Sequence, residues 1–248
     1  MSMKICVVVP TYNEAQNLPD LVRRLFDEDI PGLEILVVDD ASPDGTGDLA
    51  DSLAQQHPGQ FHVLHRKGKL GLASAYRDGF REALRLGATV IAQIDADLSH
   101  PPEHVVKLIA PILEGKADVV IASRYVSGGS ADPDWPLHRK ALSKGGNIYA
   151  RLVTGMPIND STSGFRCFRS EVLEKDGLID RPKCRGFGFQ AEMAYHCWRE
   201  GFRIQEVPYV FHDREKGSSK ISMNIVVEAL VRLPQLRLSR KYSSNRVP

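Results

Sequence analysis

The hydrophobic residues of this chain gather in short runs that are separated by longer stretches of mixed character. The runs are rich in Val, Ile, Leu and Ala, and they lie at residues 5–9, 33–38, 61–64, 90–94 and 117–122. Runs of this length, bounded by turn residues, are typical of strands that are buried on both faces of a sheet.

The stretches between the runs place apolar residues at helical spacing. Asn13 is a candidate cap for a helix that includes Leu18 to Phe26, and further helices are predicted to about Gln56, from Leu70 to Leu86 and from about Pro102 to Leu113. Strands and helices that alternate in this way indicate βαβ units. We therefore expect a mostly parallel sheet that is flanked by helices and has right-handed crossovers.

The pattern changes after residue 123. A loop at 126–136, a polar loop at 160–166 and a polar loop at 212–219 are interleaved with predicted helices at 138–152 and 189–200 and a strand at 204–209. No linker-like stretch or internal repeat divides the chain. The predicted organisation is one domain over 1–219, with a change of pattern between 1–123 and 124–219, followed by a C-terminal segment (220–248).

Two carboxylates one residue apart, Asp95 and Asp97, end the hydrophobic run at 90–94. In open α/β sheets, ligands bind at the carboxyl ends of the strands. Repulsion between two such carboxylates is relieved by a hard cation such as Mg²⁺ or Mn²⁺, which is commonly held by one or two carboxylates together with substrate phosphates. The alternative is a solvated loop in which Asp97 or Ser99 caps the next helix.

Polar residues also follow two other predicted strands. Pro10, Tyr12 and Glu14 come after the first strand, and Asp39 and Asp40 come after the second. Because parallel strands end at the same edge of a sheet, we expect these residues to converge with the Asp95 and Asp97 pair. Carboxylates can accept hydrogen bonds from a base or a ribose hydroxyl, and Tyr12 can stack on a base.

The composition of the chain and the sequence features that it lacks argue against several classes of protein. Of the 248 residues, 32 are basic and 31 acidic, so charge gives no support for a nucleic-acid partner. The four scattered cysteines indicate reduced thiols and a cytoplasmic setting. We find no secretory signal and no stretch of roughly twenty apolar residues that could span a bilayer. The first predicted strand-to-helix turn contains no glycine, which argues against a dinucleotide-binding fold.

Several motifs in order resemble those of a known family. The segments 10–14 (PTYNE), 38–46 (VDDASPDGT) and 95–101 (DADLSHP) are similar to family 2 glycosyltransferases with a GT-A fold. The segments 123–129 (SRYVSGG), 160–166 (DSTSGFR), 186–190 (GFGFQ) and 217–220 (GSSK) are similar to dolichol- or polyprenol-phosphate mannosyltransferases. The resemblance covers nearly the whole chain and implies a single Rossmann-like α/β catalytic domain with a mostly parallel sheet. It also implies a nucleotide-sugar-binding half (1–123) and an acceptor-binding half (124–219).

The resemblance also implies roles for individual residues. It implies Mg²⁺ or Mn²⁺ at Asp95 and Asp97, and Ser99 stands where some relatives have a metal-binding Gln. Contacts to GDP-mannose are implied at Pro10, Tyr12, Glu14, Asp39, Asp40, Asp95, Ala96, Asp97, Arg214 and Lys220. Contacts to the acceptor phosphate are implied at Arg124, Arg139 and Ser143. Asp97, Arg124 and Arg214 are the candidate catalytic residues.

The implied reaction is inverting transfer of mannose from GDP-mannose to a polyprenyl monophosphate. A phosphomonoester with a second pKa of about 6 is already anionic near neutral pH, so such an acceptor needs no catalytic base. Three alternatives stay open. The donor can be UDP-glucose, or the acceptor can be a sugar hydroxyl with Asp160 or Glu192 as the base, or the chain can be a nucleotide-sugar sensor without activity.

The C-terminal segment carries polar residues at every fourth position from Lys220 to Arg232, among mostly apolar neighbours, and a basic tail follows. This pattern predicts a helix that Pro234 ends. The helix either packs into the domain or lies on a membrane or on a small membrane-protein partner. A polyprenyl acceptor favours peripheral association with the cytoplasmic face of a membrane.

Overall fold

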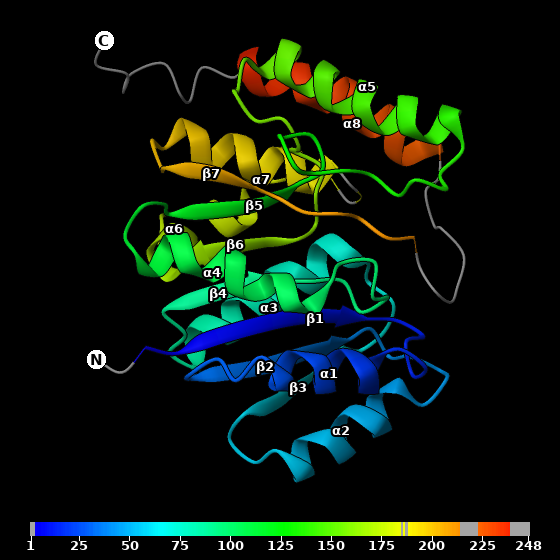
Figure 1. Cartoon of the computed structure of the whole chain (residues 1–248), viewed down its shortest axis with the longest axis vertical. Coiled ribbons are helices and arrows are strands. Elements are labelled where there is room, and N and C mark those ends of the chain that lie inside the picture. The colour runs from blue at the N-terminus through cyan, green and yellow to red at the C-terminus, as the bar shows by residue number, and fades with distance from the viewer. Residues whose placement is uncertain (1–2, 185, 187, 214–222, 239–248) are drawn as a thin grey trace.

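The computed structural model describes residues 3–184, 186, 188–213 and 223–238. Its centre is a seven-stranded sheet in the order β3-β2-β1-β4-β6-β5-β7 (Figure 1). The strands are β1 (Ile5–Thr11), β2 (Leu33–Asp39), β3 (Phe61–His65), β4 (Val90–Gln93), β5 (Val119–Ser123), β6 (Arg166–Arg169) and β7 (Ile204–Pro208). Neighbouring strands are parallel except at β6, which runs antiparallel to both β4 and β5.

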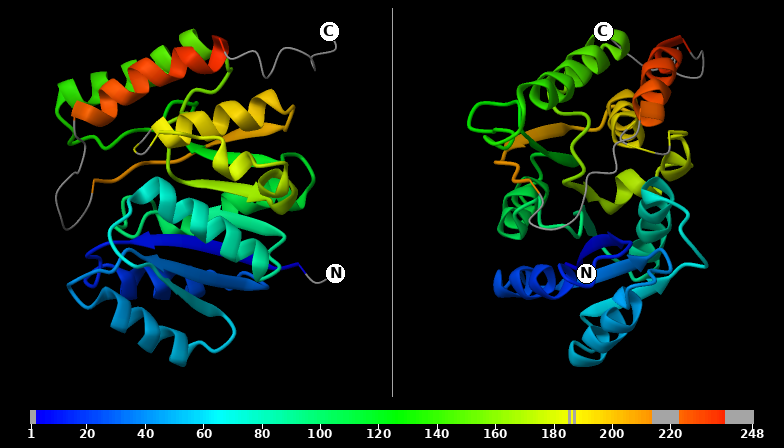
Figure 2. Two further views of the ribbon diagram at one scale, coloured as in Figure 1. Left: turned by 180° about the vertical axis from the view of Figure 1, so that it is seen from behind. Right: turned by 90° about the vertical axis from the view of Figure 1, so that its right-hand side faces the viewer.

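Helices cover both faces of the sheet. They are α1 (Leu18–Asp27), α2 (Thr46–Gln56), α3 (Leu72–Arg85), α4 (Val105–Leu113), α5 (Leu137–Thr154), α6 (Ser170–Glu174), α7 (Gly188–Arg199) and α8 (Met223–Leu238), with short 3₁₀ turns η1 (Pro102–His104) and η2 (Leu178–Asp180). Helices α1 and α4 lie on one face, and α3, α6 and α7 lie on the other (Figure 2). The expected α/β architecture, a mostly parallel sheet flanked by helices, is confirmed.

Alternation along β1 builds the two halves of the core. Ile5, Val7 and Val9 pack with the apolar faces of α1 and α4, whereas Cys6 and Val8 pack with α3. All residues of β1 and β2 are buried, which explains why their sequences read as continuous apolar runs. The edge formed by these strand ends is therefore fixed by two packed layers.

Helices α5 and α8 form a separate pair beyond the β7 edge of the sheet. They lie side by side in every view (Figures 1 and 2), and the Tyr149 hydroxyl on α5 donates a hydrogen bond of 2.7 Å to the Leu230 carbonyl oxygen on α8. No helix in the described part of the chain is both long and apolar enough to cross a bilayer.

Strand β6 was not predicted: only its first residue, Arg166, falls in the predicted polar loop, and the short run to Arg169 carries arginine at both ends. Two local expectations are wrong. Helix α8 continues through Pro234 to Leu238, since its last turn packs on the core and the Tyr195 hydroxyl donates to the Leu236 carbonyl oxygen. Helix α1 begins after Asn17, while Asn13 takes a left-handed backbone conformation with φ of 60°.

Candidate active site

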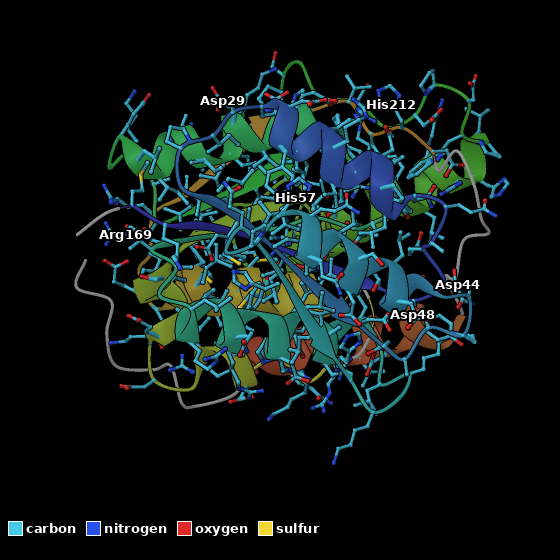
Figure 3. The ribbon with its side chains drawn as sticks, turned by 90° about the horizontal axis from the view of Figure 1, so that it is seen from below. Asp29, Asp44, Asp48, His57, Arg169 and His212 are labelled. Atoms are coloured by element: carbon cyan, nitrogen blue, oxygen red, sulfur yellow. The ribbon has the colours of Figure 1, made fainter. Side chains whose placement is uncertain are left out.

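The carboxyl ends of β2, β1 and β4 meet at one edge of the sheet because these strands are adjacent and parallel. The loop after β2 carries Asp44, which lies at the opposite end of the molecule from Arg169 on antiparallel β6 (Figure 3). Pro10, Asp39, Asp40 and the Asp95 segment are thus brought to the same edge. The three strand-end groups named from the sequence converge in the fold.

Asp39 and Asp40 organise the loops that line this edge. Asp39 Oδ1 accepts hydrogen bonds from the hydroxyls of Thr11 at 2.9 Å and Ser42 at 2.6 Å. Asp40 forms a buried ion pair with Arg66, and its Oδ2 accepts from the backbone N–H groups of Leu70 (3.1 Å) and Gly71 (2.9 Å). Both carboxylates are nearly inaccessible, so they hold the shape of this wall of the site.

The residues after β1 line the same wall. Tyr12 is half-buried, and the Lys69 ammonium lies 3.9 Å from the centre of its ring. Glu14 Oε2 accepts a hydrogen bond of 2.9 Å from Asn17 Nδ2, and the Glu14 N–H donates to Thr46 Oγ1. Pro10 is buried within β1 itself. An aromatic ring under a cation at a strand end is a surface on which a base can stack.

Each carboxylate of the Asp95 and Asp97 pair accepts a hydrogen bond that holds it in place. The Tyr76 hydroxyl donates to Asp95 Oδ1 at 2.7 Å, and the Ser99 N–H donates to Asp97 Oδ1 at 3.1 Å. Burial first, and then the charges of Asp95 and Asp97, raise the pKa of Tyr76 well above its usual value. The phenol therefore stays protonated and remains a donor to the Asp95 carboxylate.

The alternative in which Asp97 or Ser99 caps the next helix is wrong. The N-cap positions of η1 and α4 are Pro101 and His104, neither of which makes a side-chain cap, and Asp97 is 5% exposed rather than solvated. Ala41 and Leu98, which directly follow the two acidic pairs, have φ values of 54° and 60°. A left-handed conformation costs a non-glycine residue about 1–2 kcal/mol, and such strain gathers at functional sites.

The residues present fit a cation that is shared with a diphosphate. Among the described residues, no group of three His, Cys, Asp or Glu side chains could enclose a metal, whereas the Asp95 side chain remains 27% exposed. Gly164 leaves space here, because a Cβ atom at this position would lie 3.5 Å from Asp95 Oδ2. Ser99 is buried and its N–H is used by Asp97, so a role for its hydroxyl stays a prediction.

Arg124 is bound to Asp160 in a buried pair. Its Nε and Nη2 atoms donate to Asp160 Oδ2 and Oδ1, both at 2.7 Å, and Nη2 also donates to Thr162 Oγ1 at 3.0 Å. Burial acts to raise the pKa of Asp160, but the Arg124 charge and hydrogen bonds outweigh it and hold that pKa below its usual value. Asp160 thus anchors Arg124 and is poorly placed to accept a proton.

The other residues expected on the acceptor side gather around aromatic rings. Arg139 donates to Asp213 at 2.7 Å, and its guanidinium lies 4.0 Å from the centre of the Trp135 ring. The Tyr125 hydroxyl donates to Ser143 Oγ at 2.7 Å. The Arg124 guanidinium lies 5.4 Å from the Tyr125 ring and 5.7 Å from the Phe211 ring. Arg214 and Lys220 lie outside the described residues.

Glu192, the second carboxylate considered as a base, has a structural environment. It is 1% exposed and accepts hydrogen bonds from the backbone N–H groups of Lys183 and Cys184. These contacts tie the start of α7 to the segment before it. Neither Glu192 nor Asp160 offers a carboxylate that could reach an acceptor hydroxyl.

Sequence reasoning missed several residues that shape this site, chiefly Arg66, Tyr76 and His100. His100 is 3% exposed, its Nε2 lies 3.7 Å from Asp95 Oδ2, and its ring lies 5.2 Å from that of Phe165. Only the position of His100 directly after the Asp95 segment could have drawn attention to it. Arg66 and Tyr76 reach the site from other elements, which no local pattern reveals.

A mostly parallel sheet whose strand ends carry clustered carboxylates and an Asp-x-Asp pair, with arginines on the other side, is the arrangement of a glycosyltransferase of the GT-A type. The family model "Glycosyl transferase family 2" matches residues 6–177. The chain belongs to this family, and it is an enzyme of the glycosyltransferase class.

Curated relatives match almost the whole chain. The "Undecaprenyl-phosphate mannosyltransferase" of Micrococcus luteus is 43% identical over 244 residues, which are 98% of each protein. The "Polyprenol monophosphomannose synthase" of Mycolicibacterium smegmatis is 44% identical over 94% of this chain and 87% of its own length. The "Dolichol-phosphate mannosyltransferase" of Pyrococcus furiosus is 40% identical over 92% of this chain and 62% of its own length.

Solved structures agree on the fold. Glucosyl-3-phosphoglycerate synthase from Mycobacterium tuberculosis, crystallised with Mn²⁺ and UDP-glucose, superposes with a TM-score of 0.69 at 18% identity, over 94% of this chain and 80% of that one. The same enzyme with Mg²⁺ and UDP gives a TM-score of 0.63 at 19% identity, over 96% and 78%. At this level of sequence identity, the structural similarity supports a shared fold only.

The Asp160→Asn variant separates a structural carboxylate from a catalytic base. We expect the free energy of unfolding to fall by about 3–5 kcal/mol, because the variant leaves the Arg124 charge buried without its partner. Since the folded-state pKa of Asp160 is depressed, this contribution is present above the carboxyl's ordinary value of 3.8 and is lost as the pH falls through the folded-state value. Urea unfolding at neutral and acid pH measures both.

The exposed carboxylate of Asp176 supplies the control, since Asp176→Asn should leave the unfolding curve unchanged. An Asp160→Asn protein with wild-type stability and no transfer activity would instead assign the base to Asp160.

Proposed function

We propose that this glycosyltransferase transfers mannose from GDP-mannose to a polyprenyl monophosphate. The product is a β-linked polyprenyl phosphate mannose, formed with inversion at the anomeric carbon. The observation that carries the proposal is that both spare carboxylates, Asp160 and Glu192, are buried and occupied by other groups. An acceptor that brings its own anionic oxygen needs neither of them.

The relatives support the same acceptor and sugar. Three proteins that are 40–44% identical to this chain are named as mannosyltransferases or a phosphomannose synthase of undecaprenyl, polyprenol or dolichol phosphate. The differences among these lipids lie in the polyprenol, while the phosphate and the mannose are common to all three names. The phosphate and the sugar are therefore the features that we assign to this chain.

On the acceptor side, Arg124, Arg139 and Ser143 would hold the lipid phosphate. Arginine suits this role because its guanidinium stays charged and binds phosphate oxygens bidentately. The Arg139 guanidinium forms an ion pair with Asp213, whose side chain is 44% exposed. A phosphate from solvent can therefore compete with Asp213 for the guanidinium. The phosphate oxygen then attacks the anomeric carbon in line with the departing diphosphate.

On the donor side, Tyr12 and Glu14 would contact the guanine base and the ribose, and the buried Asp39 and Asp40 would support the wall against which the nucleotide lies. Pro10 and Ala96 are buried in the strand-end walls, where their backbone borders the nucleotide. Arg214 and Lys220 are proposed to bind the donor's phosphates. These residues would orient the sugar toward the acceptor phosphate on the other side of the site.

Asp95 and Asp97 would hold a Mg²⁺ or Mn²⁺ ion, with Ser99 beside them. When bound, the ion neutralises charge that develops on the leaving diphosphate. Tyr76 and the Ser99 N–H keep the two carboxylates oriented for it. The protein's own contribution is this fixed geometry together with the positive charges opposite.

Helix α5 is the surface that we propose to rest on the membrane. It carries Arg139 and Ser143 and has no acidic residue, yet it exposes Leu137 (83%) and Leu152 (72%). Leu142, Ile148 and the basic Lys140, Lys144 and Arg151 extend this face. The sequence pattern had suggested the segment from Lys220 to Leu233, but the described α8 packs against α5 and α7. An apolar and basic helix beside a lipid-phosphate site fits an anionic bilayer.

The acceptor decides between this function and its rivals. We expect GDP-mannose to be turned over with undecaprenyl phosphate and not with undecaprenol, because the alcohol lacks the charged nucleophile. The rate should rise with pH through the acceptor's own pKa of about 6. Product formation is followed with radiolabelled donors, GDP-mannose and UDP-glucose in parallel. Equal turnover of alcohol and phosphate contradicts the acceptor, and preference for UDP-glucose contradicts the donor.

A second prediction concerns the metal. Asp97→Asn should abolish transfer while the melting temperature of the protein stays nearly unchanged, since asparagine keeps the oxygen that accepts from Ser99. Calorimetry should show that the variant no longer binds GDP more tightly when Mn²⁺ is added. Asp29→Asn, at an exposed site whose left-handed backbone suits asparagine, is the control. Full activity of the native protein in excess chelator contradicts the prediction.

A third prediction concerns the membrane. The double variant Leu137→Ser/Leu152→Ser should co-sediment with anionic vesicles at least about tenfold less than the native protein, because full burial of each leucine is worth about 1.5–3 kcal/mol. Binding of the native protein should also weaken as salt rises. The control is Val106→Ser/Leu113→Ser, which changes two apolar residues of α4 that are 41% and 45% exposed. Equal sedimentation of the two double variants contradicts the assignment to α5.

A further inference from the structure

Arg166, the first residue of β6, is a buried cation without a carboxylate partner. Its exposed fraction is 0%, and no carboxylate in the described part of the chain lies within ion-pair distance of it. Its guanidinium instead donates to three backbone carbonyl oxygens, those of Ser163 (2.8 Å), Gln190 (2.8 Å) and Ser161 (2.5 Å). Burying an ion costs several kcal/mol, so this arrangement needs an explanation.

Two of these carbonyls belong to the loop that runs from Asp160 to Gly164. A third carbonyl of the loop, that of Gly164, accepts a hydrogen bond of 2.7 Å from Nε2 of Gln93, which is also fully buried on β4. Arg166 and Gln93 therefore hold the loop from its buried side through three hydrogen bonds to its backbone carbonyl oxygens. Lysine could not replace this fork, because a single ammonium cannot match the planar geometry of three separate donors.

The loop connects the two halves of the active site. At one end Asp160 and Thr162 hold the guanidinium of Arg124. At the other end Gly164 lies against the Asp95 carboxylate, where a Cβ atom would come within 3.5 Å of Asp95 Oδ2. A shift of the loop would therefore move Arg124 relative to Asp95, which changes the distance between acceptor phosphate and donor diphosphate.

We infer that Arg166 is a positioning residue for glycosyl transfer: by holding the carbonyls of Ser161 and Ser163, it sets the placement of Arg124 relative to Asp95. The inference rests on the proposed function, in which Arg124 binds the acceptor and Asp95 the metal. Arg166 touches neither substrate. Its effect on the reaction passes through the loop.

The positive charge of Arg166 strengthens its hydrogen bonds to the loop. Burial lowers the pKa of Arg166 to about 10, which still leaves the guanidinium protonated at neutral pH. Hydrogen bonds from a charged donor are about twice as strong as those between neutral groups. Gln190 adds a tie to α7, so the loop is fastened to an element outside the site as well.

The experiment compares Arg166→Lys and Gln93→Met with the native full-length protein in mannose transfer to undecaprenyl phosphate. We expect kcat to fall at least about tenfold in each variant, because small misplacements of reacting groups cost that much or more. The dissociation constant for GDP with Mn²⁺ should change little. The double variant should lose less than the product of the two single losses, because both side chains act through one loop.

Val22→Ala in α1 is the control for stability, since it removes buried volume on a face of the sheet away from the loop. It should lower the melting temperature and leave kcat unchanged. The inference is overturned if Arg166→Lys keeps the native kcat, if Val22→Ala loses kcat in proportion to its melting temperature as the site variants do, or if the single losses multiply. Should Arg166→Lys not fold, Gln93→Met decides alone.

Failure of the proposed function looks different. In that case the native protein itself does not transfer mannose to the lipid phosphate. The same variants are then compared in hydrolysis of the nucleotide sugar, where native-like rates for Arg166→Lys would overturn the positioning role separately.

Discussion

Crowding of carboxylates at one edge of a parallel sheet is the constraint on which the rest of this structure depends. Asp39, Asp40 and Asp97 are nearly buried there. Each buried carboxylate must be matched by donors, because an unpaired ion in a protein interior is expensive. The fold supplies hydroxyls from Thr11 and Ser42, a guanidinium from Arg66 and a backbone N–H from Ser99. These partners in turn fix the loops that form the walls of the site.

The second half of the chain contributes positive charge. Arg124 and Arg166 are both buried and both bind the loop from Asp160 to Gly164, and of the two only Arg124 has a carboxylate partner. Arg124 binds side chains of this loop, whereas Arg166 binds its backbone carbonyl oxygens. This distribution of charge suits the metal ion and nucleotide that we propose on one side and the anionic acceptor that we propose on the other. The likeness to family 2 glycosyltransferases thus has a physical basis in how the charges are distributed.

Much of the fold could be predicted because its signals are local. Continuous apolar runs mark β1 and β2, and the acidic pairs directly after β2 and before Leu98 mark the site edge. Strand β6 could not be found, since its antiparallel partners are distant and its ends are arginines. The persistence of α8 past Pro234 depends on packing against α5 and α7. Rules based on proline as a helix breaker take no account of such tertiary packing.

Within the site, residue types could be predicted but their partners could not. Arg124 and Asp160 were both singled out, one as a phosphate ligand and the other as a candidate base, although they lie 36 positions apart and bind each other. Pairing them changes the chemistry: the carboxylate that could have activated a hydroxyl is consumed in holding the arginine. With Glu192 similarly consumed by backbone N–H groups, the described site has strong means of binding anions and little means of removing a proton. This environment suits the acceptor that we propose, because a phosphate monoester arrives already charged whereas an alcohol would need a base.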